Sequence, residues 1–280
     1  MNSSLQANCS RCFGLCCVAL PYAKSADFAF NKESGTPCRN LQDDFRCGIH
    51  HQLREKGFKG CTVYECFGAG QKVSQNTFSG RDWEANPELA KEMFDVFPIM
   101  QQLQEMLYYL TEAMNRNETK PIIQELNVAI KEVENLTQRT ASEIKQMNVS
   151  EIRKRINELL LRASHLVREE FIHKKNPLKG KTRDLIGAKL RNADLRGANF
   201  RGALLIATDL KNADLRKADL IGADLRDADL SGADLRGCIF LTQAQVNSAK
   251  GNADTRLPVL LTRPSHWLKV KAKLKKPSVN

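Results

Sequence analysis

The chain of 280 residues has few aromatic residues and no apolar run of the length that crosses a membrane. Phe, Trp and Tyr make up 6% of it, whereas charged residues make up 27%. A transmembrane helix needs about 20 predominantly apolar residues, so an integral membrane protein is not expected. A signal peptide is not expected either, because the apolar stretch from Cys9 to Leu20 is short and no basic segment precedes it. We therefore expect a cytoplasmic protein.

The sequence also lacks the spacing patterns of common catalytic sites. No Ser/His/Asp set, phosphate-binding loop or pair of carboxylates stands out along the chain. Histidine is scarce, and its five positions are His50, His51, His165, His173 and His266. Two of these, His165 and His173, lie among Arg and Glu residues of a predicted amphipathic helix and are expected at its surface. Any chemistry must therefore come from other residue types.

What the sequence has instead is a five-residue repeat over residues 183–242. Leu or Phe occupies residues 185, 190, 195, 200, 205, 210, 215, 220, 225, 230, 235 and 240. Ala stands two positions earlier in nine of the twelve units, and Gly often stands two positions later. In an α-helix, five residues advance about 500°, so successive Leu side chains would point in different directions. In a flat strand, a step of five residues would place successive Leu side chains on opposite faces. The repeat predicts a chain that turns a corner in every unit, with Leu, Phe and Ala inside a coil and with coils that stack.

Several units of this repeat read Ala-Asp-Leu, among them Ala193–Leu195, Ala213–Leu215, Ala218–Leu220 and Ala233–Leu235. They resemble the motif of the pentapeptide-repeat family, Ala-(Asp/Asn)-Leu-x-x. The resemblance implies a right-handed quadrilateral β-helix with four units per coil, and therefore about three coils for the twelve units. The ends of such a stack need covering, so we expect a cap over Leu241–Leu257 with a short helix at Gln243–Ala249. Cys238 stands at an Ala position and is expected in the core.

The charged residues of the repeat are also periodic. Asp precedes Leu at residues 194, 209, 214, 219, 224, 229 and 234, and Arg follows Leu or Phe at 191, 196, 201, 216, 226 and 236. Asp in such positions forms turn hydrogen bonds, so we expect these carboxylates at the corners and not in a catalytic or calcium site. Residues 183–242 carry ten Lys or Arg and nine Asp or Glu. Some members of the family mimic a DNA duplex and bind topoisomerases, but this balance lacks the acidic field that such a mimic needs.

The net charge of +11 is concentrated at the C-terminus, where residues 243–280 carry +7. The lysines that dominate this tail are Lys269, Lys271, Lys273, Lys275 and Lys276. A solvated tail that aids solubility is the simplest interpretation. Contact with nucleic acid or with an anionic surface is the alternative. Base stacking has little support, because Trp267 is the single aromatic residue nearby.

Eight of the nine cysteines lie close together in the sequence, at Cys9, Cys12, Cys16, Cys17, Cys38, Cys47, Cys61 and Cys66. Without an export signal the chain is expected in a reducing compartment, which favours thiolate chemistry over a disulfide framework. Zinc takes four thiolate or imidazole ligands, and an iron–sulfur cluster takes four cysteines. Eight thiolates can fill two such sites. Apolar residues are sparse in this segment, and metal is a typical source of stability for a segment with a thin core.

Other residues of the cysteine-rich segment follow a recognisable order. After the leading cysteine group come Pro-Cys-x-x-Leu at Pro37–Leu41, Cys-x-Ile at Cys47–Ile49 and Cys-x4-Cys at Cys61–Cys66. This outline resembles the zinc- or iron-chelating Cys-x-x-Cys-x-x-Cys-Cys family. In this chain, however, the spacer before Cys16 has three residues instead of two, and His50 stands where the family usually has Tyr. The resemblance implies chelation of zinc or iron by the eight cysteines, with His50 and His51 as weaker candidates.

Residues 84–176 are predicted to form helices. Asn86, Pro87 and Glu88 are typical of a helix start, with an N-cap residue, Pro at the first helical position and an acid in the first turn. Apolar residues then follow a heptad spacing, at Met93, Val96, Met100, Leu103, Leu107, Leu110 and Met114. Pro98 lies inside this pattern and should kink or split the helix near Phe97.

Two more helices are predicted after a turn at Asn115–Lys120. One restarts at Pro121 and carries a seam from Leu126 to Met147, and the next is capped by Ser150 and carries a seam from Ile152 to Leu166. Short turns favour antiparallel packing into a hairpin or three-helix bundle. The same coiled-coil seams could instead pair two copies of the chain as a homo-oligomer.

The sequence thus predicts a multidomain protein. Its parts are a cysteine-rich metal-binding head (residues 1–83), an α-helical hairpin or bundle (84–176), a pentapeptide-repeat β-helix (177–242) and a C-terminal cap with a basic tail (243–280). The favoured function is a metal-binding interaction scaffold for a protein partner. The alternative is an enzyme with a redox iron–sulfur or zinc centre in the cysteine cluster, and a DNA mimic that binds a topoisomerase is the least favoured.

Overall fold

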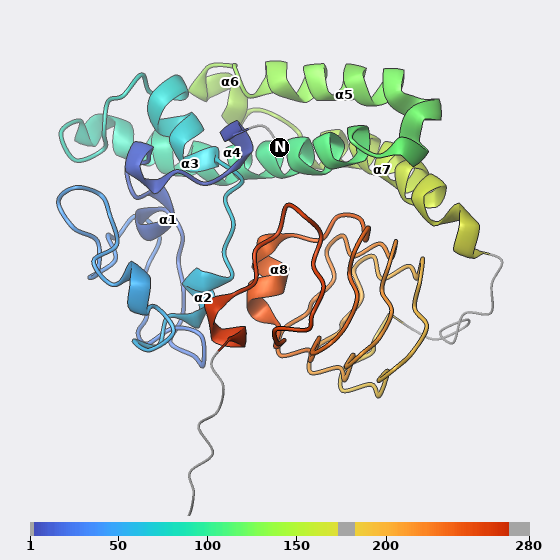
Figure 1. The fold of residues 1–280 in the computed structure, drawn as a ribbon. Coiled ribbons are helices and arrows are strands. Elements are labelled where there is room, and N and C mark those ends of the chain that lie inside the picture. The colour runs from blue at the N-terminus through green and yellow to red at the C-terminus, as the bar shows by residue number, and fades with distance from the viewer. Residues whose placement is uncertain (1–2, 173–182, 269–280) are drawn as a thin grey trace, which may run out of the picture. The chain divides into compact units, whose positions relative to one another are not determined.

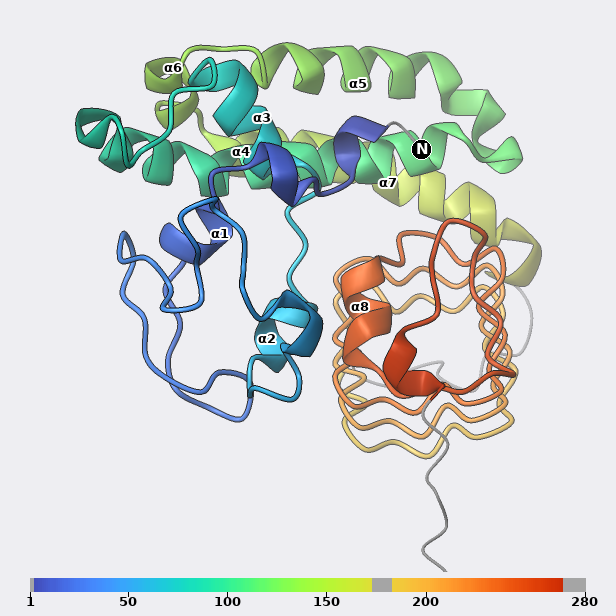
Figure 2. The same ribbon diagram turned by 60° about the vertical axis from the view of Figure 1, so that its left-hand side comes forward.

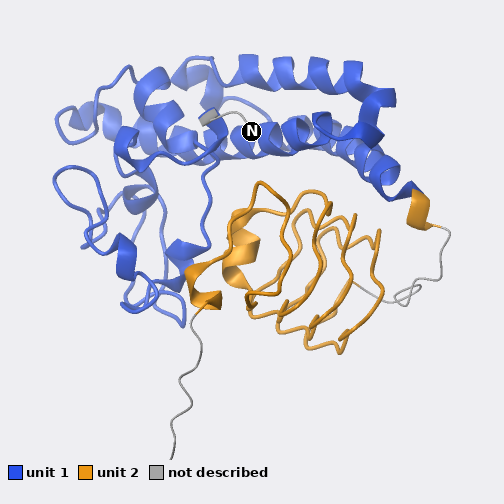
Figure 3. Cartoon of the chain, viewed as in Figure 1, with its two compact units in different colours: residues 1–169 blue, residues 170–280 orange. Residues whose placement is uncertain are grey.

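The computed structural model describes residues 3–172 and 183–268. The chain separates into two compact units, residues 1–169 and 170–280 (Figure 3). The predicted linker Asn176–Gly180, His173 and the five lysines of the tail lie outside the described residues. Within the described ranges, no helix is both long enough and apolar enough to cross a bilayer.

The cysteine-rich part of the first unit consists of short helical turns and loops. Its elements are η1 (Ser3–Leu5), η2 (Cys9–Arg11), α1 (Leu15–Val18), η3 (His50–Gln52), α2 (Lys59–Thr62), α3 (Ala69–Lys72) and the π-helical turn η4 (Val73–Thr77). Gly14 and Gly68 precede α1 and α3 with φ of 63° and 83°, a left-handed conformation that glycine adopts without strain. The loops are tied together by isolated antiparallel bridges between Tyr22 and Lys32 and between Leu41 and Cys47.

Two apolar clusters hold these turns in place. The first joins the segment to α4 through the buried residues Leu15, Val18, Phe78, Met93 and Phe97. The second is aromatic: Tyr22 stacks on Phe28 with ring centroids 4.4 Å apart, and Phe30 meets Phe58 edge-on at 5.2 Å. The segment therefore has more core than its sparse apolar residues suggest, because its few aromatic side chains gather at one place.

Helix α4 (Pro87–Met114) begins where the sequence predicts, with Asn86 at the N-cap position and proline at the first helical position. The predicted split near Phe97 is wrong, because α4 stays helical through Pro98. The residues buried around this proline are Met93, Val96, Phe97 and Met100. Their burial on both sides of Pro98 holds the two halves of the helix to the same neighbours and offsets the missing backbone hydrogen bond.

The predicted second helix is interrupted. The elements after α4 are η5 (Asn117–Ile122), α5 (Ile123–Leu136), α6 (Ala141–Lys145) and α7 (Val149–Ile172). The expected seam is divided between α5 and α6 because Thr140 and Glu143 form a capping box that starts a new helix. Helix α7 is capped by Asn148 and not by Ser150, since the Asn148 Oδ1 accepts the Glu151 N–H at 3.2 Å.

Helix α4 packs against α5 and α6, and α7 lies alongside α4 (Figures 1 and 2). The inward face of α7 buries Ile152, Ile156, Leu159, Leu160, Ala163 and Val167. Three ion pairs link α7 to its neighbours, namely Arg153–Glu105 to α4, and Arg155–Glu132 and Arg162–Glu125 to α5. The predicted bundle therefore forms within one chain.

The repeat forms a coil whose turns are joined by parallel bridges between residues 20 apart (Figures 1 and 2). Its four columns of bridges are Asp184–Leu204–Asp224, Lys189–Asp209–Asp229, Asp194–Asp214–Asp234 and Asn199–Asp219–Ile239. A spacing of 20 residues gives the four units per coil and the three levels that the sequence predicts. The predicted β-helix differs in one respect: the bridges are isolated, and the described residues contain no extended strand, because the chain bends after every bridge. The handedness implied by the family resemblance stays a prediction.

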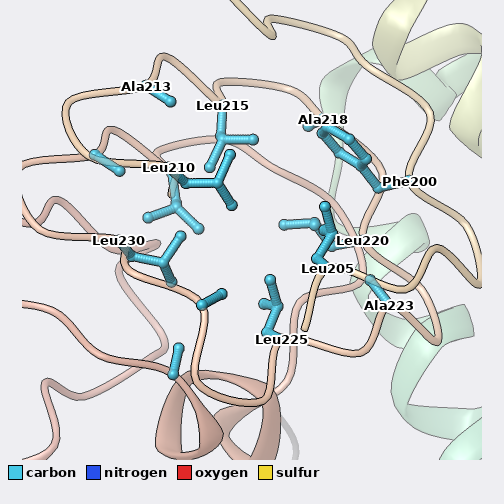
Figure 4. Packing of buried hydrophobic residues seen from close by; sticks show 14 of the residues in the cluster. Phe200, Leu205, Leu210, Ala213, Leu215, Ala218, Leu220, Ala223, Leu225 and Leu230 are labelled. Carbon is cyan, nitrogen blue, oxygen red and sulfur yellow. The ribbon is translucent and has the colours of Figure 1, made fainter. Parts of the chain in front are cut away.

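Each unit of the coil repeats one conformation. The Leu side chains point into the coil (Figure 4) and are buried, as are Phe200 and Cys238. The residue two positions after Leu has a positive φ in eleven successive units, at residues 187, 192, 197, 202, 207, 212, 217, 222, 227, 232 and 237. Five of these are not glycine: Asn192, Ala207, Asn212, Lys217 and Asp227. The corner is thus a left-handed residue, which glycine favours but which the stack also imposes on other residues.

The Asp before each Leu closes the corner, as predicted. The Asp234 Oδ1 accepts the backbone N–H of Arg236 at 3.1 Å, and the same carboxylate accepts Nε and Nη2 of that arginine at 2.9 and 2.6 Å. Equivalent pairs are Asp194–Arg196, Asp214–Arg216 and Asp224–Arg226. Arg201 instead reaches the next coil and forms a buried ion pair with Asp219 at 2.9 Å. The periodic charges are therefore largely internal pairs.

The predicted cap is present over the end of the coil. Helix α8 (Gln243–Ser248) starts with a capping box of Thr242 and Gln245. After it, Lys250 and Arg256 form bridges to Asp229 and Asp234 and so extend two of the four columns by one level. The short turn η6 (Ser265–Trp267) places the Trp267 indole against the core, where its Nε1 donates to the Ala249 carbonyl at 2.9 Å. The cap therefore closes the hydrophobic interior that the open end would expose.

Candidate metal-binding cysteine site

All eight predicted metal ligands lie in the first unit, and all are free thiols. They come from short turns and loops: Cys9 from η2, Cys16 and Cys17 from α1, Cys61 from α2, and Cys12, Cys38, Cys47 and Cys66 from the connections. Cys38 is buried, Cys9 and Cys61 are exposed, and the other five are half-buried. The sequence elements that join them are too short to fix the sulfurs by themselves, so the apolar clusters described above position them.

Cys12, Cys16 and Cys66 act on one another electrostatically, and Cys9 acts on Cys12 and Cys66 and itself responds to Cys17. Burial, together with the neighbouring Cys66 and Cys9, raises the pKa of Cys12 to about 12. The hydrogen bond with Cys17 and burial raise the pKa of Cys16 well above its ordinary value, and Cys12 and Cys66 add to this. Burial also raises the pKa of Cys66, with Cys9 among its charged neighbours. We call these four residues the first thiol group.

The other four thiols, Cys17, Cys38, Cys47 and Cys61, form a second thiol group. Burial raises the pKa of Cys61 to about 12, and its electrostatic neighbours are the other three members. Burial likewise raises the pKa of Cys47, and the neighbouring Cys17 and Cys38 and also Cys9 of the first group add to this. The two groups meet at α1, where the sulfurs of Cys16 and Cys17 lie 4.0 Å apart.

Backbone N–H groups point at several of these sulfurs. Hydrogen bonds from Leu15 and Gly14 act on Cys12, and hydrogen bonds from Gly70 and Gly68 act on Cys66, each lowering the pKa that burial raises. Gly70 also makes room for the first group, because a Cβ at this position would lie 2.5 Å from the Cys12 sulfur. Such donors stabilise the thiolate over the thiol, and hydrogen bonds to sulfur are a usual second layer around metal-bound cysteines.

Each thiol group also has one tyrosine hydroxyl. The Tyr22 hydroxyl donates to the Cys38 sulfur at 3.2 Å in the second group. The Tyr64 hydroxyl is buried and has no hydrogen-bond partner within the described residues, and its electrostatic neighbours are Cys66, Cys16 and Cys12 of the first group. A buried hydroxyl without a partner is costly, so Tyr64 fits a site where a thiolate accepts a hydrogen bond from its hydroxyl.

A buried lysine lies beside the second group. The Lys32 Nζ donates to the carbonyl oxygens of Val18, Glu33 and Thr36 at 2.9 to 3.1 Å. Desolvation lowers its pKa, whereas the neighbouring Cys38 and Cys17 raise it. The sequence pattern did not single out Lys32, Tyr22 or Tyr64, because nothing in their spacing shows that the loops carrying them meet at the cysteines.

The thiols are near one another but are not gathered around a point. Among the residues that the structure describes, no three or more Cys, His, Asp or Glu side chains are arranged to hold a metal ion. His50 and His51 lie on η3, both exposed, with ring centroids 5.8 Å apart. The donor chemistry itself fits zinc or an iron–sulfur cluster, since both take four thiolates. The pKa is raised for six of the thiols, which makes them poor nucleophiles near neutral pH, whereas the hydrogen bond with Cys16 and the nearby Lys32 lower the pKa of Cys17.

Comparisons with known proteins bear on the repeat and on the whole chain. The family profile described as Pentapeptide repeats (8 copies) matches residues 184–220 and 203–240. The chain is 64% identical over 264 residues to the uncharacterized protein YybG of Bacillus subtilis (strain 168), and the match covers 94% of this chain and 95% of YybG. A solved pentapeptide repeat protein from the thylakoid lumen of Arabidopsis thaliana matches at 33% identity and a TM-score of 0.20, over 27% of this chain and 51% of that one.

Proposed function

We propose that this chain, which belongs to the same family as YybG and is a pentapeptide-repeat protein, binds metal ions through its cysteines. We propose in addition that its repeat coil binds a protein partner. The observation that supports the metal proposal is the gathering of eight free thiols in the turns and loops of the first unit, where neighbouring thiols act on one another. The rigid coil supports the second part, because a stacked coil presents a fixed surface on each side. The identity of the partner is left to experiment.

The first thiol group supplies four donors for one metal centre, and the second group supplies four for another. Tyr64 and Tyr22 would each donate a hydrogen bond to a thiolate, and Gly70 would keep space beside Cys12. Lys32 would offset part of the negative charge that four thiolates bring to the second group. A bound zinc ion would supply cross-links between the loops, whereas an iron–sulfur cluster would supply one-electron chemistry.

A redox or zinc enzyme is the second candidate, and one observation favours it. Each thiol group contains one cysteine that is exposed as a residue, Cys9 in the first group and Cys61 in the second, although its thiol is partly covered. Solvent access at one ligand is what a centre needs in order to exchange electrons or admit a substrate. Mimicry of DNA is disfavoured, because the arginines of the coil neutralise its aspartates in place.

Elemental analysis and an absorption spectrum of full-length protein purified without oxygen test the metal proposal. We expect zinc or iron at a ratio that corresponds to two four-cysteine centres. Cys12→Ser and Cys66→Ser should each lower the metal content, since both remove a ligand of the first group. Cys238→Ala is the matched control, because Cys238 is buried in the coil at an Ala position and should leave the metal content unchanged. Wild-type protein without zinc or iron would refute the proposal.

The same spectrum separates the two candidates. Charge-transfer absorption in the visible range and bleaching by dithionite would support a redox centre. A colourless protein with zinc held by four thiolates in both centres would support the scaffold and count against the enzyme.

A further inference from the structure

A cavity of about 400 Å³ lies in the first unit among η1, α3, α4 and the end of α5. Apolar surface comes from Leu5 and Leu107, and polar groups come from Lys72, Gln104 and Glu134. None of the described residues that line it is a cysteine, so this cavity is separate from the thiol groups. Its volume falls in the range of small-molecule sites, about 300–1,000 Å³.

Gln104 is the unusual residue of this cavity. It lies on the buried face of α4 beside Leu103, and its side chain is 3% exposed. Its Oε1 has no hydrogen-bond donor within the part of the chain that the structure describes. Buried amide oxygens nearly always have a donor, supplied by protein, water or ligand. An acceptor left over at the wall of a cavity therefore indicates that the cavity takes a molecule with an N–H or O–H group.

Two opposite charges line the same cavity. Lys72 is the last residue of α3, and Glu134 lies in the last turn of α5. They attract each other, because Glu134 raises the pKa of Lys72 that burial lowers. No ion pair within 4.0 Å joins them among the described residues, so space remains between the two charges. The carbonyl end of α5 adds negative potential beside Glu134.

We propose that this cavity binds a free α-amino acid or dipeptide in its zwitterionic form. The carboxylate of the ligand pairs with Lys72, and its ammonium group pairs with Glu134 at the end of α5. A ligand N–H donates to the Gln104 Oε1, and its side chain lies against Leu5 and Leu107. Glu134 is exposed and Lys72 is half-buried, so a ligand with a single charge would pair with only one of the two groups and would gain less than a zwitterion.

Calorimetric titration of the full-length protein tests this proposal. The probes are the twenty standard amino acids and the dipeptides Ala-Ala, Gly-Leu and Gly-Gln. We expect saturable binding of at least one probe, and at least about tenfold weaker binding of its N-acetylated or esterified form, since each lacks one charge. Lys72→Met and Glu134→Gln should also weaken binding about tenfold or more. Lys91→Met and Glu158→Gln, at exposed positions away from the cavity, should leave it unchanged.

A third variant separates binding from folding. Gln104→Met keeps the size of the side chain and removes the acceptor without a donor, so the protein should melt at the same or a higher temperature. The same variant should bind the probe about tenfold more weakly or worse. The proposal is wrong if no probe binds, if blocked and free forms bind equally, or if Gln104→Met and Lys72→Met bind as the wild type does.

Discussion

The repeat coil and the cysteine-rich segment solve the same problem in different ways. Both belong to a chain with 6% aromatic residues, and both must hold irregular backbone in one conformation. The coil does so by repetition. Every fifth residue is buried, the corner residues share one left-handed conformation, and backbone hydrogen bonds run from each level to the next. The segment over residues 9–66 has no such repetition. Two apolar clusters hold its loops, and it carries eight thiols.

The difference shows what each region needs from outside the chain. In the coil, the periodic Asp and Arg side chains pair within the repeat, and the cap closes one end. In the cysteine-rich segment, two features await a partner: the thiols are not gathered and the Tyr64 hydroxyl has no acceptor within the described residues. A coil that completes its own bonding suits a platform, and a segment with unused donors suits a ligand site.

Metal removal should give the largest contrast between the two regions. If the cysteines bind structural metal, a strong chelator with a thiol reductant should unfold the loops of residues 9–66, since such binding contributes about 10–16 kcal/mol in small zinc domains. The coil should be unaffected. Amide hydrogen exchange, read separately for the two regions before and after chelation, measures this. Equal protection before and after chelation in residues 9–66 would contradict the metal proposal.

A substitution that creates a cavity inside the coil should destabilise the coil and leave the cysteine-rich segment unchanged. Leu210 is completely buried, so Leu210→Ala should destabilise the coil by about 2–5 kcal/mol and leave the metal content unchanged. Ile186→Ala is the matched control, because Ile186 belongs to the same repeat but is about half exposed and should cost less than about 1 kcal/mol. Denaturant unfolding monitored by hydrogen exchange gives both values. A loss of metal in Leu210→Ala would show that the two regions depend on each other.

The coil could be predicted from the sequence because one local rule decides it. Each unit places Leu inward and turns after it, so the period of five predicts the stacked coil, and the family resemblance implied its four units per coil and three levels. The left-handed conformation of Ala207 and Lys217 could not be predicted, because these residue types disfavour it. The neighbouring levels of the stack impose it. Helix ends were harder. Asn148 and Ser150 are both good caps, and only the hydrogen bond to Glu151 decides between them.

The sequence supplies the candidate residues of the site but not their arrangement. Clustering identified the cysteines, since thiols scattered for packing alone would not gather in one segment. Their division into two groups could not be predicted, because Cys12 and Cys66 meet through loops whose paths depend on the apolar clusters. Tyr64 and Gly70 carry no spacing signal, and their roles appear only when the Cys12 sulfur is placed beside them.

Gly70→Ala should test whether the Cys12 sulfur is a metal ligand. The added Cβ would lie 2.5 Å from the Cys12 sulfur, so Cys12 must move, and the affinity of the first thiol group for metal should fall about 10- to 100-fold. A competition titration with a chromogenic chelator measures this change. Gly80→Ala is the control: no atom lies within 4 Å of its Cβ, and its positive φ costs only about 1 kcal/mol. Equal affinities for the two variants would remove Cys12 from the ligand set.

Acid should have the smallest effect, and it should act on the coil. Hydrogen bonds from Arg236 lower the pKa of Asp234 in the folded state below its unfolded value of about 3.9. The stabilisation is therefore fully present above pH 5 and is lost as the pH falls through the lowered folded-state pKa. Because these pairs are partly exposed, each should contribute about 0.2–1 kcal/mol. Thermal melts between pH 7 and pH 3 should show a weaker pH dependence in Asp234→Asn than in wild type, whereas Asp254→Asn, in the exposed cap loop, should match wild type. If Asp234→Asn kept the full pH dependence, the Asp234–Arg236 pair would contribute nothing to the free energy of unfolding. The coil would then be stabilised by its apolar interior and its backbone hydrogen bonds.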